Sequence, residues 1–285
     1  MDTMDMERVA QCCGPEISGP QRAIVETAAR AALAGGAVLR ELYGKPHRVT
    51  HKGAIDLVTE ADVASEEKIL AILGELGNDA ALLAEESCPG YAEKPVGPVW
   101  IIDPLDGTTN FAHGFPVFAV SIAYADGGET RAGVVYAPMQ DELFCACLGR
   151  GAWLNGRPVR VSGVVGLRDA LLATGFPYAI DEELDGVLAA LRRLLPRCQG
   201  VRRPGAAAVD LAFLACGRVD GFWEVNLKPW DTAAGLLLVT EAGGMVSTLN
   251  GGPCSPFLPE LLASNGRIHR EMQEQLRDFS RLARE

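Results

Sequence analysis

Hydrophobic residues near the start of the chain recur at helical spacing. In residues 21–43 they lie three or four positions apart among many alanines, which predicts a helix that ends at Gly44 and Pro46. A second helix is predicted after Asp62, where acidic residues occupy the first turns and suit the helix dipole. Residues 1–19 lack such a pattern, so we expect a flexible N-terminal tail there.

Short apolar runs in the middle of the chain predict strands. The run at 99–102 contains no polar residue, which is typical of a strand buried on both faces, and it stops at Asp103. Turn residues separate the runs that follow, and Asn155-Gly156 is typical of a hairpin. We therefore expect an antiparallel sheet here. The later runs are 117–125, 132–136 and 143–148.

Beyond residue 161 the pattern changes to strands that alternate with helices, which is typical of an α/β fold. This change divides the chain into an N-terminal α+β half at 20–163 and a C-terminal α/β half at 164–285. The predicted strands are 170–174, 221–225 and 261–263. The predicted helices are 184–195, 207–216, 232–242 and 268–282.

Composition narrows the function. The 285-residue chain has a formal net charge of −11, so its surface repels nucleic acid and anionic membranes. The same charge repels phosphate, and a phosphate enzyme of this composition needs a local reversal of sign that divalent metal ions supply. No apolar run is long enough to span a membrane, and we expect a cytoplasmic protein whose eight cysteines are reduced.

Acidic residues cluster at the ends of predicted strands and the starts of predicted helices, and carboxylates are the ligands that Mg²⁺ prefers. Each cluster also has a structural explanation. Asp62 and Asp231 each precede a helix and could be N-caps, and Glu85-Glu86 could be a solvated pair. Asp103 and Asp106 could belong to an ordinary turn that opens a helix.

The segment from Asp103 to Thr109 has the composition of a combined metal and phosphate site. Asp103 emerges from a buried strand and Asp106 follows closely, so two carboxylates lie near each other. Gly107 permits close approach of the backbone, and the amides of Thr108 and Thr109 are free to bind an anion if a helix begins there.

Four segments, in this order and spacing, resemble the inositol monophosphatase family of Mg²⁺-dependent, lithium-sensitive phosphatases. They are DLVTEAD at 56–62, AEES at 84–87, WIIDPLDGTTNF at 100–111 and WDTAAG at 230–235. The resemblance covers residues 22–270 and implies a layered αβαβα sandwich with the site between the halves. It also implies a homodimer.

The resemblance assigns metal ligands and catalytic residues by position, for two or three Mg²⁺ ions. The implied ligands are Glu85, Asp103, the carbonyl of Leu105, Asp106 and Asp231, with Glu86 and Lys52 in support. Asp62 is expected to bond Thr108 and, together with Glu85, to orient the attacking water.

The resemblance also assigns the substrate contacts. Gly107 and Thr108 amides hold the phosphate beside Asp106 and Asp231. Gly205, Ala206, Ala207 and Glu224 line the pocket for the polyol. Ala206 departs from the family, whose members usually carry Ser or Thr at this position, which leaves the identity of the polyol open.

The implied activity is hydrolysis of small phosphate monoesters, foremost myo-inositol monophosphate, by a metal-activated water. Alternatives are fructose-1,6-bisphosphatase activity, another sugar or nucleotide phosphatase, and a regulatory binding protein of the same fold. The regulatory alternative draws attention to a basic run made of Arg192, Arg193, Arg197, Arg202 and Arg203. We expect a small phosphorylated polyol or sugar as partner, and neither a membrane nor nucleic acid bound directly.

Overall fold

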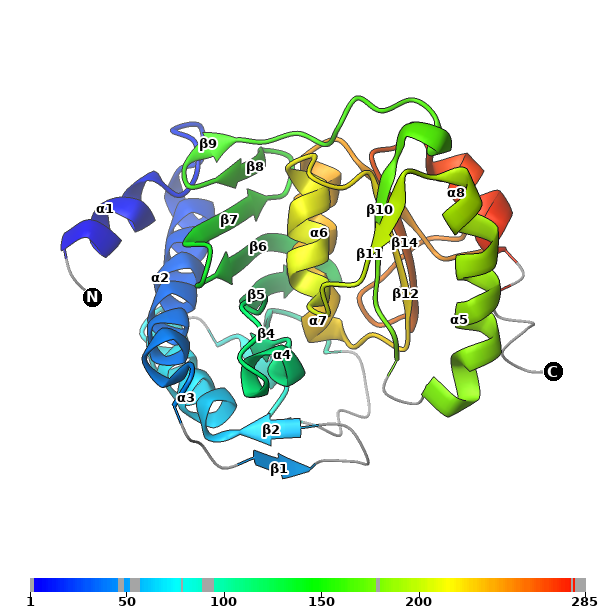
Figure 1. Cartoon of the computed structure of the whole chain (residues 1–285). Helices are drawn as coiled ribbons and strands as arrows, with labels where there is room; N and C mark the ends of the chain where they lie inside the picture. The colour runs from blue at the N-terminus through cyan, green and yellow to red at the C-terminus, as the bar shows by residue number, and fades with distance from the viewer. Residues whose placement is uncertain are drawn as a thin grey trace.

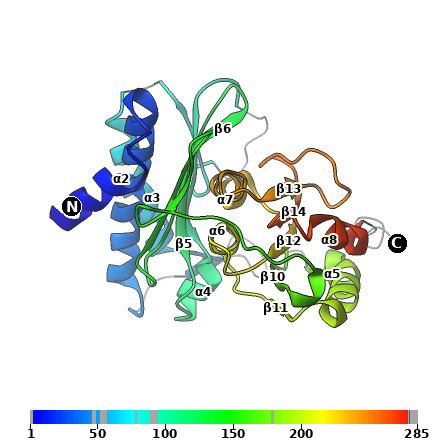
Figure 2. The same ribbon diagram turned by 90° about the horizontal axis from the view of Figure 1, so that it is seen from above.

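A computed structural model describes residues 3–45, 49–51, 57–77, 79–88, 95–177, 180–277 and 279. Its helices and sheets form alternating layers, in the order αβαβα (Figures 1 and 2). Helices α2 and α3 form one outer layer, and α5 and α8 form the other. Helices α6 and α7 lie between the two sheets. The expected layered α/β fold is therefore confirmed.

The larger sheet has seven strands in sequence order. They are β3 (Ala81–Ala84), β4 (Val99–Asp106), β5 (Ala119–Asp126), β6 (Glu129–Ala137), β7 (Glu142–Cys147), β8 (Gly151–Leu154) and β9 (Arg157–Pro158). Every neighbouring pair is antiparallel except β3 and β4, which are parallel. The sequence pattern did not predict β3, whereas the hairpin expected at Asn155-Gly156 joins β8 to β9.

Strand β4 is buried on both faces, as its apolar run predicted. Trp100 and Ile102 pack on the side of α2 (Gly19–Leu42) and α3 (Glu60–Gly74), and Ile101 packs on the side of α6 and α7. The strand does not stop at Asp103. It continues to Asp106 through a register shift that contains Pro104, because proline has no N–H to donate to the neighbouring strand.

The N-terminal residues are more ordered than the expected tail. Residues Thr3–Gln11 form helix α1, and Arg22 of α2 donates to the carbonyls of Ala10 and Ile17. Cys12, Cys13 and Ile17 are buried in the core between α2 and the larger sheet. Burial of these side chains explains why the segment folds although its helix is too short to be stable alone.

The middle layer places two apolar helices against the larger sheet. These helices are α6 (Ala207–Ala215) and α7 (Pro229–Glu241). Helix α7 approaches β6 so closely that a Cβ at Gly133 would lie 2.9 Å from the backbone of Ala234. Glycine at this position therefore sets how near the helix, and the residues at its start, come to the sheet.

The second sheet has five strands in the order β11-β10-β12-β14-β13. They are β10 (Leu171–Thr174), β11 (Gly200–Arg202), β12 (Gly221–Val225), β13 (Met245–Ser247) and β14 (Glu260–Ser264). Strand β10 is parallel to β11 and β12, whereas β14 is antiparallel to β12 and β13. Helices α5 (Ile180–Leu194) and α8 (His269–Leu276) cover its outer face (Figure 1).

Smaller elements complete the described chain. Strands β1 (Val49–His51) and β2 (Leu57–Thr59) pair antiparallel, and α4 (Thr108–Ala112) follows β4 directly. The 3₁₀ turns η1 (Leu167–Asp169) and η2 (Leu195–Arg197) flank β10 and α5. In this part of the chain no helix combines the length and the apolar character that crossing a membrane requires.

Candidate active site

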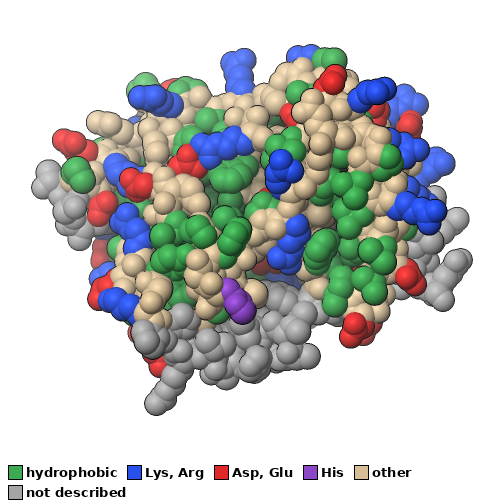
Figure 3. Space-filling view, viewed as in Figure 1, with side chains coloured by type: hydrophobic (Ala, Val, Ile, Leu, Met, Phe, Trp, Pro, Cys, Tyr) green, Lys and Arg blue, Asp and Glu red, His purple; other side chains and the backbone are tan. Residues whose placement is uncertain are grey.

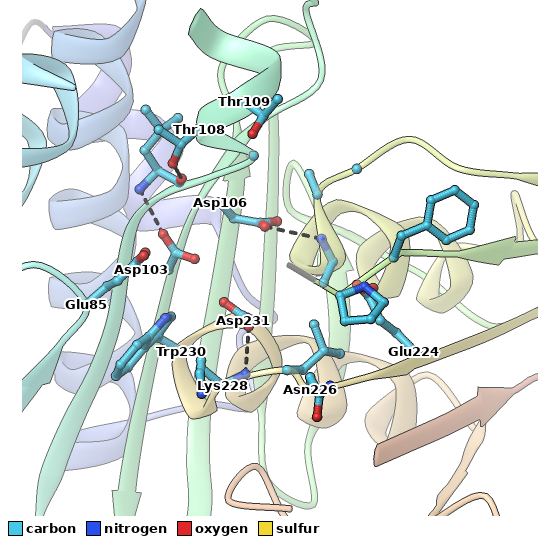
Figure 4. A pocket seen from close by; sticks show the side chains of 18 of the residues that line it. Glu85, Asp103, Asp106, Thr108, Thr109, Glu224, Asn226, Lys228, Trp230 and Asp231 are labelled. Atoms are coloured by element: carbon cyan, nitrogen blue, oxygen red, sulfur yellow. Dashed lines mark hydrogen bonds between the residues drawn. The ribbon is translucent and has the colours of Figure 1, made fainter. Parts of the chain in front are cut away.

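A pocket of about 460 Å³ lies where β4, α4, α6 and the start of α7 meet (Figure 4). Its size is typical of sites for small molecules. Residues of both halves of the sequence line it. Those that the sequence also singled out are Glu85, Asp103, Leu105, Asp106, Gly107, Thr108, Gly205, Ala206, Ala207, Glu224 and Asp231.

Asp103 and Asp106 lie on the irregular end of β4, and backbone amides hold both. The Leu105 N–H donates to Asp103 Oδ1 at 2.9 Å. The first amides of α6 reach across the pocket to Asp106, with Ala207 N at 3.2 Å from Oδ1 and Ala208 N at 2.8 Å from Oδ2. Asp106, from the N-terminal half, therefore caps α6, a helix of the C-terminal half. This contact connects the two sides of the pocket.

Asp231 lies in the first turn of α7 and is not the N-cap that the sequence suggested. The helix begins at Pro229, and the Lys228 N–H donates to Asp231 Oδ2 at 2.7 Å. The helix N-terminus favours the negative charge of Asp231 on the pocket side.

Glu85 follows β3, and its backbone N–H donates to the Ile102 carbonyl at 3.1 Å, which fixes it beside β4. It lines the pocket, whereas Glu86 does not. The Glu86 backbone N–H instead bonds Oε2 of Glu66 on α3 at 2.9 Å. Lys52 lies outside the described residues.

The carboxylates in the pocket repel one another. Burial, together with the charges of Glu85, Asp106 and Asp231, raises the pKa of Asp103 well above its ordinary range. Burial also raises the pKa of Asp106 to about 7, and burial with the charge of Asp106 raises that of Asp231 to about 7. Such shifts mark a site that favours bound positive charge.

The donor set fits a hard divalent cation. Carboxylate oxygens of Glu85, Asp103, Asp106 and Asp231 and the carbonyl of Leu105 all belong to residues that line the same pocket. Oxygen donors of this kind suit Mg²⁺ and disfavour softer metals. Among the described residues, no three acidic, His or Cys side chains converge on one point as placed.

Asp62 reaches the pocket only through Thr108. The Thr108 hydroxyl lies 3.0 Å from both Asp62 Oδ1 and the Leu105 carbonyl. Asp62 itself is fully buried in the first turn of α3, where its other oxygen accepts from the N–H of Thr59 at 2.7 Å. The N-cap is thus Thr59, and α3 begins two residues before Asp62.

Gly107 makes the turn between β4 and α4 in a left-handed conformation, with φ of 92°. A Cβ at this position would lie 3.0 Å from the Val117 carbonyl and 3.2 Å from the Ala206 Cβ. Only glycine fits both restrictions. The turn brings Thr108 and Thr109 to the pocket wall.

The far side of the pocket contains Glu224 and Ala206. Burial and the charges of Asp231 and Asp106 raise the pKa of Glu224 to about 8. Ala206 is the N-cap of α6 and has no side-chain oxygen to cap it, so Asp106 takes the first helix amides instead. A hydroxyl at position 206 would thus lie at a helix start, and capping is one reason for Ser or Thr there.

Several of the lining residues were not placed in the pocket by the sequence analysis. Arg203 lies with its guanidinium 5.1 Å from the centre of the Phe176 ring, and Asn226 and Lys228 line the same side. They come from loops, where neither periodicity nor a motif marks a residue as part of a site. Buried Asp210, on α6, was also not identified.

Comparison with known proteins agrees with this geometry. The family model described as "Inositol monophosphatase family" matches residues 21–281. An inositol-1-monophosphatase of Synechocystis is 46% identical over 88% of this chain and 88% of its own length. The Nus factor SuhB of Escherichia coli K12 is 42% identical over 90% of this chain and 96% of its own.

A solved structure shows the same fold. The inositol monophosphatase of Anabaena (Nostoc) sp. PCC 7120 superposes with a TM-score of 0.81 at 41% identity, and the match covers 90% of this chain and 96% of that one. The family match spans both sheets and every described residue of the pocket. The chain belongs to the inositol monophosphatase family.

Proposed function

We propose that this enzyme hydrolyses monoesters of phosphate with small polyols, and that myo-inositol monophosphate is its substrate. Its family consists of phosphatases that are generally metal-dependent. The observation that carries the proposal is the gathering of Glu85, Asp103, Asp106 and Asp231 in one pocket beside the Gly107 turn. A pocket lined by acidic side chains from separate segments is suited to hold a cation and a phosphate together.

We assign Glu85, Asp103 and the Leu105 carbonyl to one Mg²⁺, and Asp103, Asp106 and Asp231 to another; a third ion is the upper limit of the proposal. Glu86 supports this cluster from the β3 side. Bound Mg²⁺ supplies the positive charge that offsets these carboxylates and polarises the phosphate and a nearby water. The amide bonds to Asp103, Asp106 and Asp231 keep the acids in place before substrate arrives.

The residues of the Gly107 turn act on phosphate and water. In this proposal the amides of Gly107 and Thr108 bind phosphate oxygens. Because Gly107 has no side chain, the phosphate can approach the backbone closely. The Thr108 hydroxyl donates toward Asp62 or the Leu105 carbonyl, so its lone pairs are left to accept a hydrogen bond from the attacking water. Thr108 and Glu85 together orient that water.

The polyol occupies the side of the pocket formed by Gly205, Ala206, Ala207 and Glu224. Glu224 accepts a hydrogen bond from a substrate hydroxyl. A site that pairs a buried acceptor with a hydroxyl disfavours analogues that lack the hydroxyl, because the acceptor is then left unpaired.

The test is release of phosphate from purified protein with inositol 1-phosphate and Mg²⁺, with and without Li⁺. We expect turnover that requires Mg²⁺ and is inhibited by Li⁺. Absence of turnover with every phosphate monoester in a panel of polyol, sugar and nucleoside phosphates would refute the proposal.

Fructose-1,6-bisphosphatase activity is a second candidate, and two cations favour it. Arg203 and Lys228 line the pocket, and no carboxylate in the described part of the chain forms a salt bridge with Arg203. A second phosphate of the substrate could bind there. A kcat/KM for fructose 1,6-bisphosphate above that for inositol 1-phosphate would establish this activity as the main one.

A regulatory binding role is a third candidate, because the E. coli relative is named a Nus factor. Here the relevant surface is the outer side of α5. Basic side chains gather there beside exposed hydrophobic ones (Figure 3). The Arg193 and Arg197 guanidinium groups bond backbone carbonyls, so they also have a structural role. Co-purification with RNA polymerase, lost when these arginines are changed, would support regulation.

We also propose that the enzyme is a homodimer and works in the cytoplasm. Leu184 and Leu188 on α5 and Leu195 after it are 44%, 53% and 50% exposed and recur at helical spacing. Such a stripe suits burial against a second copy. Light scattering at micromolar concentration tests this, with Leu188→Lys expected to shift the protein to a monomer.

A further inference from the structure

Asp210 is an acid sealed inside the molecule on α6, close to the pocket but not lining it. Its side chain is 1% exposed. Within the described part of the chain, neither carboxyl oxygen has a hydrogen-bonding partner. Buried polar groups are almost always paired, so this exception requires an explanation.

The acids of the proposed metal site differ from Asp210, because each of them has a hydrogen-bonding partner. Asp103, Asp106 and Asp231 each accept a backbone N–H, and a carboxylate with such donors tolerates negative charge. A buried carboxylate without donors is costly when ionised. Asp210 is therefore expected to keep its proton and remain neutral.

The charges around Asp210 also favour its neutral form. Glu224 on β12 has the largest charge effect on it, followed by Asp106 on β4, and both disfavour ionisation. Arg203 in the loop before α6 is the cation that opposes them. Burial and the two acids raise the pKa of Asp210 well above its ordinary range.

Glu224 is a confined carboxyl group. It follows Trp223, which pairs with Thr174 of β10, and its head occupies the space beside Gly175. A Cβ on Gly175 would overlap the Glu224 carboxyl carbon and both oxygens. Glycine at 175 thus makes room for the head of Glu224, yet within the described chain no backbone or side-chain donor bonds it.

We propose that Asp210 is a positioning residue for substrate recognition: as an uncharged acid it donates its carboxyl hydrogen to one buried water that in turn donates to Glu224, and so directs Glu224 toward a hydroxyl of the polyol. A neutral carboxylic acid has one O–H to donate, and an oxygen of Glu224 accepts from the water in either protonation state. The inference rests on the proposed function, because Glu224 is there the acceptor for the substrate hydroxyl.

The test compares two replacements of Asp210 on two substrates. Asp210→Leu keeps the approximate size but has no donor, whereas Asp210→Asn keeps the shape and an N–H₂ donor. Inositol 1-phosphate presents hydroxyls to Glu224, and phenyl phosphate presents none. The Mg²⁺-saturated, full-length protein is used throughout.

Loss of the hydrogen bond behind Glu224 should weaken polyol binding and leave the chemistry intact. We expect Asp210→Leu to raise KM for inositol 1-phosphate by about tenfold, with kcat and the phenyl phosphate kinetics changed by less than about twofold. Asp210→Asn should stay within about twofold of the parent on both substrates. In a Glu224→Gln background, Asp210→Leu should have no further effect, because the two residues act as one unit.

Two kinetic results would overturn the inference. An equal loss on both substrates would show that Asp210 supports α6 and Asp106. A defect in Asp210→Asn as large as in Asp210→Leu would show that an ionised carboxylate is needed there.

A spectroscopic measurement makes the inference independent of enzymatic activity and of the folding of the leucine variant. The infrared spectrum at pH 7 should contain a carbonyl band of a protonated carboxylic acid that is absent from Asp210→Asn. If both proteins lack this band, Asp210 is ionised and the inference is wrong, even if the phosphatase activity is confirmed. If the band is present but no monoester is hydrolysed, the proposed function fails alone.

Discussion

The two ends of the pocket are built differently. At the end that we propose for the metal ions, Asp103, Asp106 and Asp231 lie at ends of regular elements, and backbone amides hold each of them. At the end that we propose for the polyol, the Glu224 carboxyl group lies beside Gly175, and Arg203, Asn226 and Lys228 are exposed. Backbone contacts hold the acids of the proposed metal site in place, whereas exposed side chains from loops line the proposed polyol site.

The largest effect should come from the metal end. Asp106→Asn removes a charge that the proposed Mg²⁺ site needs, and we expect kcat to fall by about 10³-fold or more with the fold kept. Phosphate release from inositol 1-phosphate at saturating Mg²⁺ measures this. Asp126→Asn, which removes a charge at the far end of β5, is the control and should retain parental activity. A parental rate in Asp106→Asn would refute the site assignment.

Thr108 should have the next largest effect. Its hydroxyl lines the pocket and donates to Asp62, and we propose that this hydrogen bond orients the hydroxyl toward the attacking water. We expect Thr108→Val to lower kcat by about 10²-fold, within the range of a lost acid–base group. Thr108→Ser keeps the hydroxyl and should recover most of the rate. Equal losses in both variants would mean that packing, and not the hydroxyl, is responsible.

Glu224 tests the polyol end. Glu224→Gln should raise KM for inositol 1-phosphate by about tenfold and leave phenyl phosphate turnover nearly unchanged. Such a split between KM and kcat would sharpen the contrast with Asp106. A loss of kcat on both substrates would instead place Glu224 with the metal ligands.

Metal removal should reveal the repulsion among the acids. Burial raises the pKa of Asp106 and Asp231 in the folded protein to about 7. In the unfolded chain these carboxyl groups lose their protons from about pH 4 upward. Between these two pH values the folded protein holds more protons than the unfolded chain, so its stability falls as the pH rises. In EDTA the Tm should therefore fall by about 4–8 °C as the pH rises from 4 to 7. A shift of this size corresponds to a loss of about 2 kcal/mol in the free energy of unfolding for a chain of this length. Saturating Mg²⁺ should remove most of this slope, and a Tm in EDTA that rises over this range would contradict the picture.

Ala206 should have the smallest effect. A serine there can cap α6, but Asp106 already holds the first two amides of the helix. We expect Ala206→Ser to stabilise the protein by at most about 0.5 kcal/mol, the low end for an N-cap, measured by urea unfolding. The KM for inositol 1-phosphate should change by less than about twofold. A larger change in KM would make residue 206 a determinant of the polyol.

The sequence predicted most of the regular structure, and the exceptions have identifiable causes. Apolar periodicity located the long helices and the central strands because burial imposes it along the chain. It did not locate β3, β11 or β13, which are short and partly exposed. The register shift that extends β4 to Asp106 is decided by pairing with β5, a contact distant in sequence.

The sequence alone determined which residue types are available for the chemistry: acids at strand ends and helix starts, and a glycine turn followed by two threonines. Only the tertiary structure decided how these acids differ. Backbone amides hold Asp103, Asp106 and Asp231, whereas Asp62 accepts a hydrogen bond from Thr108 and Asp210 is buried without a donor. The reason is physical, since burial and hydrogen-bonding partners depend on segments about a hundred residues apart, as between Asp106 and Ala208.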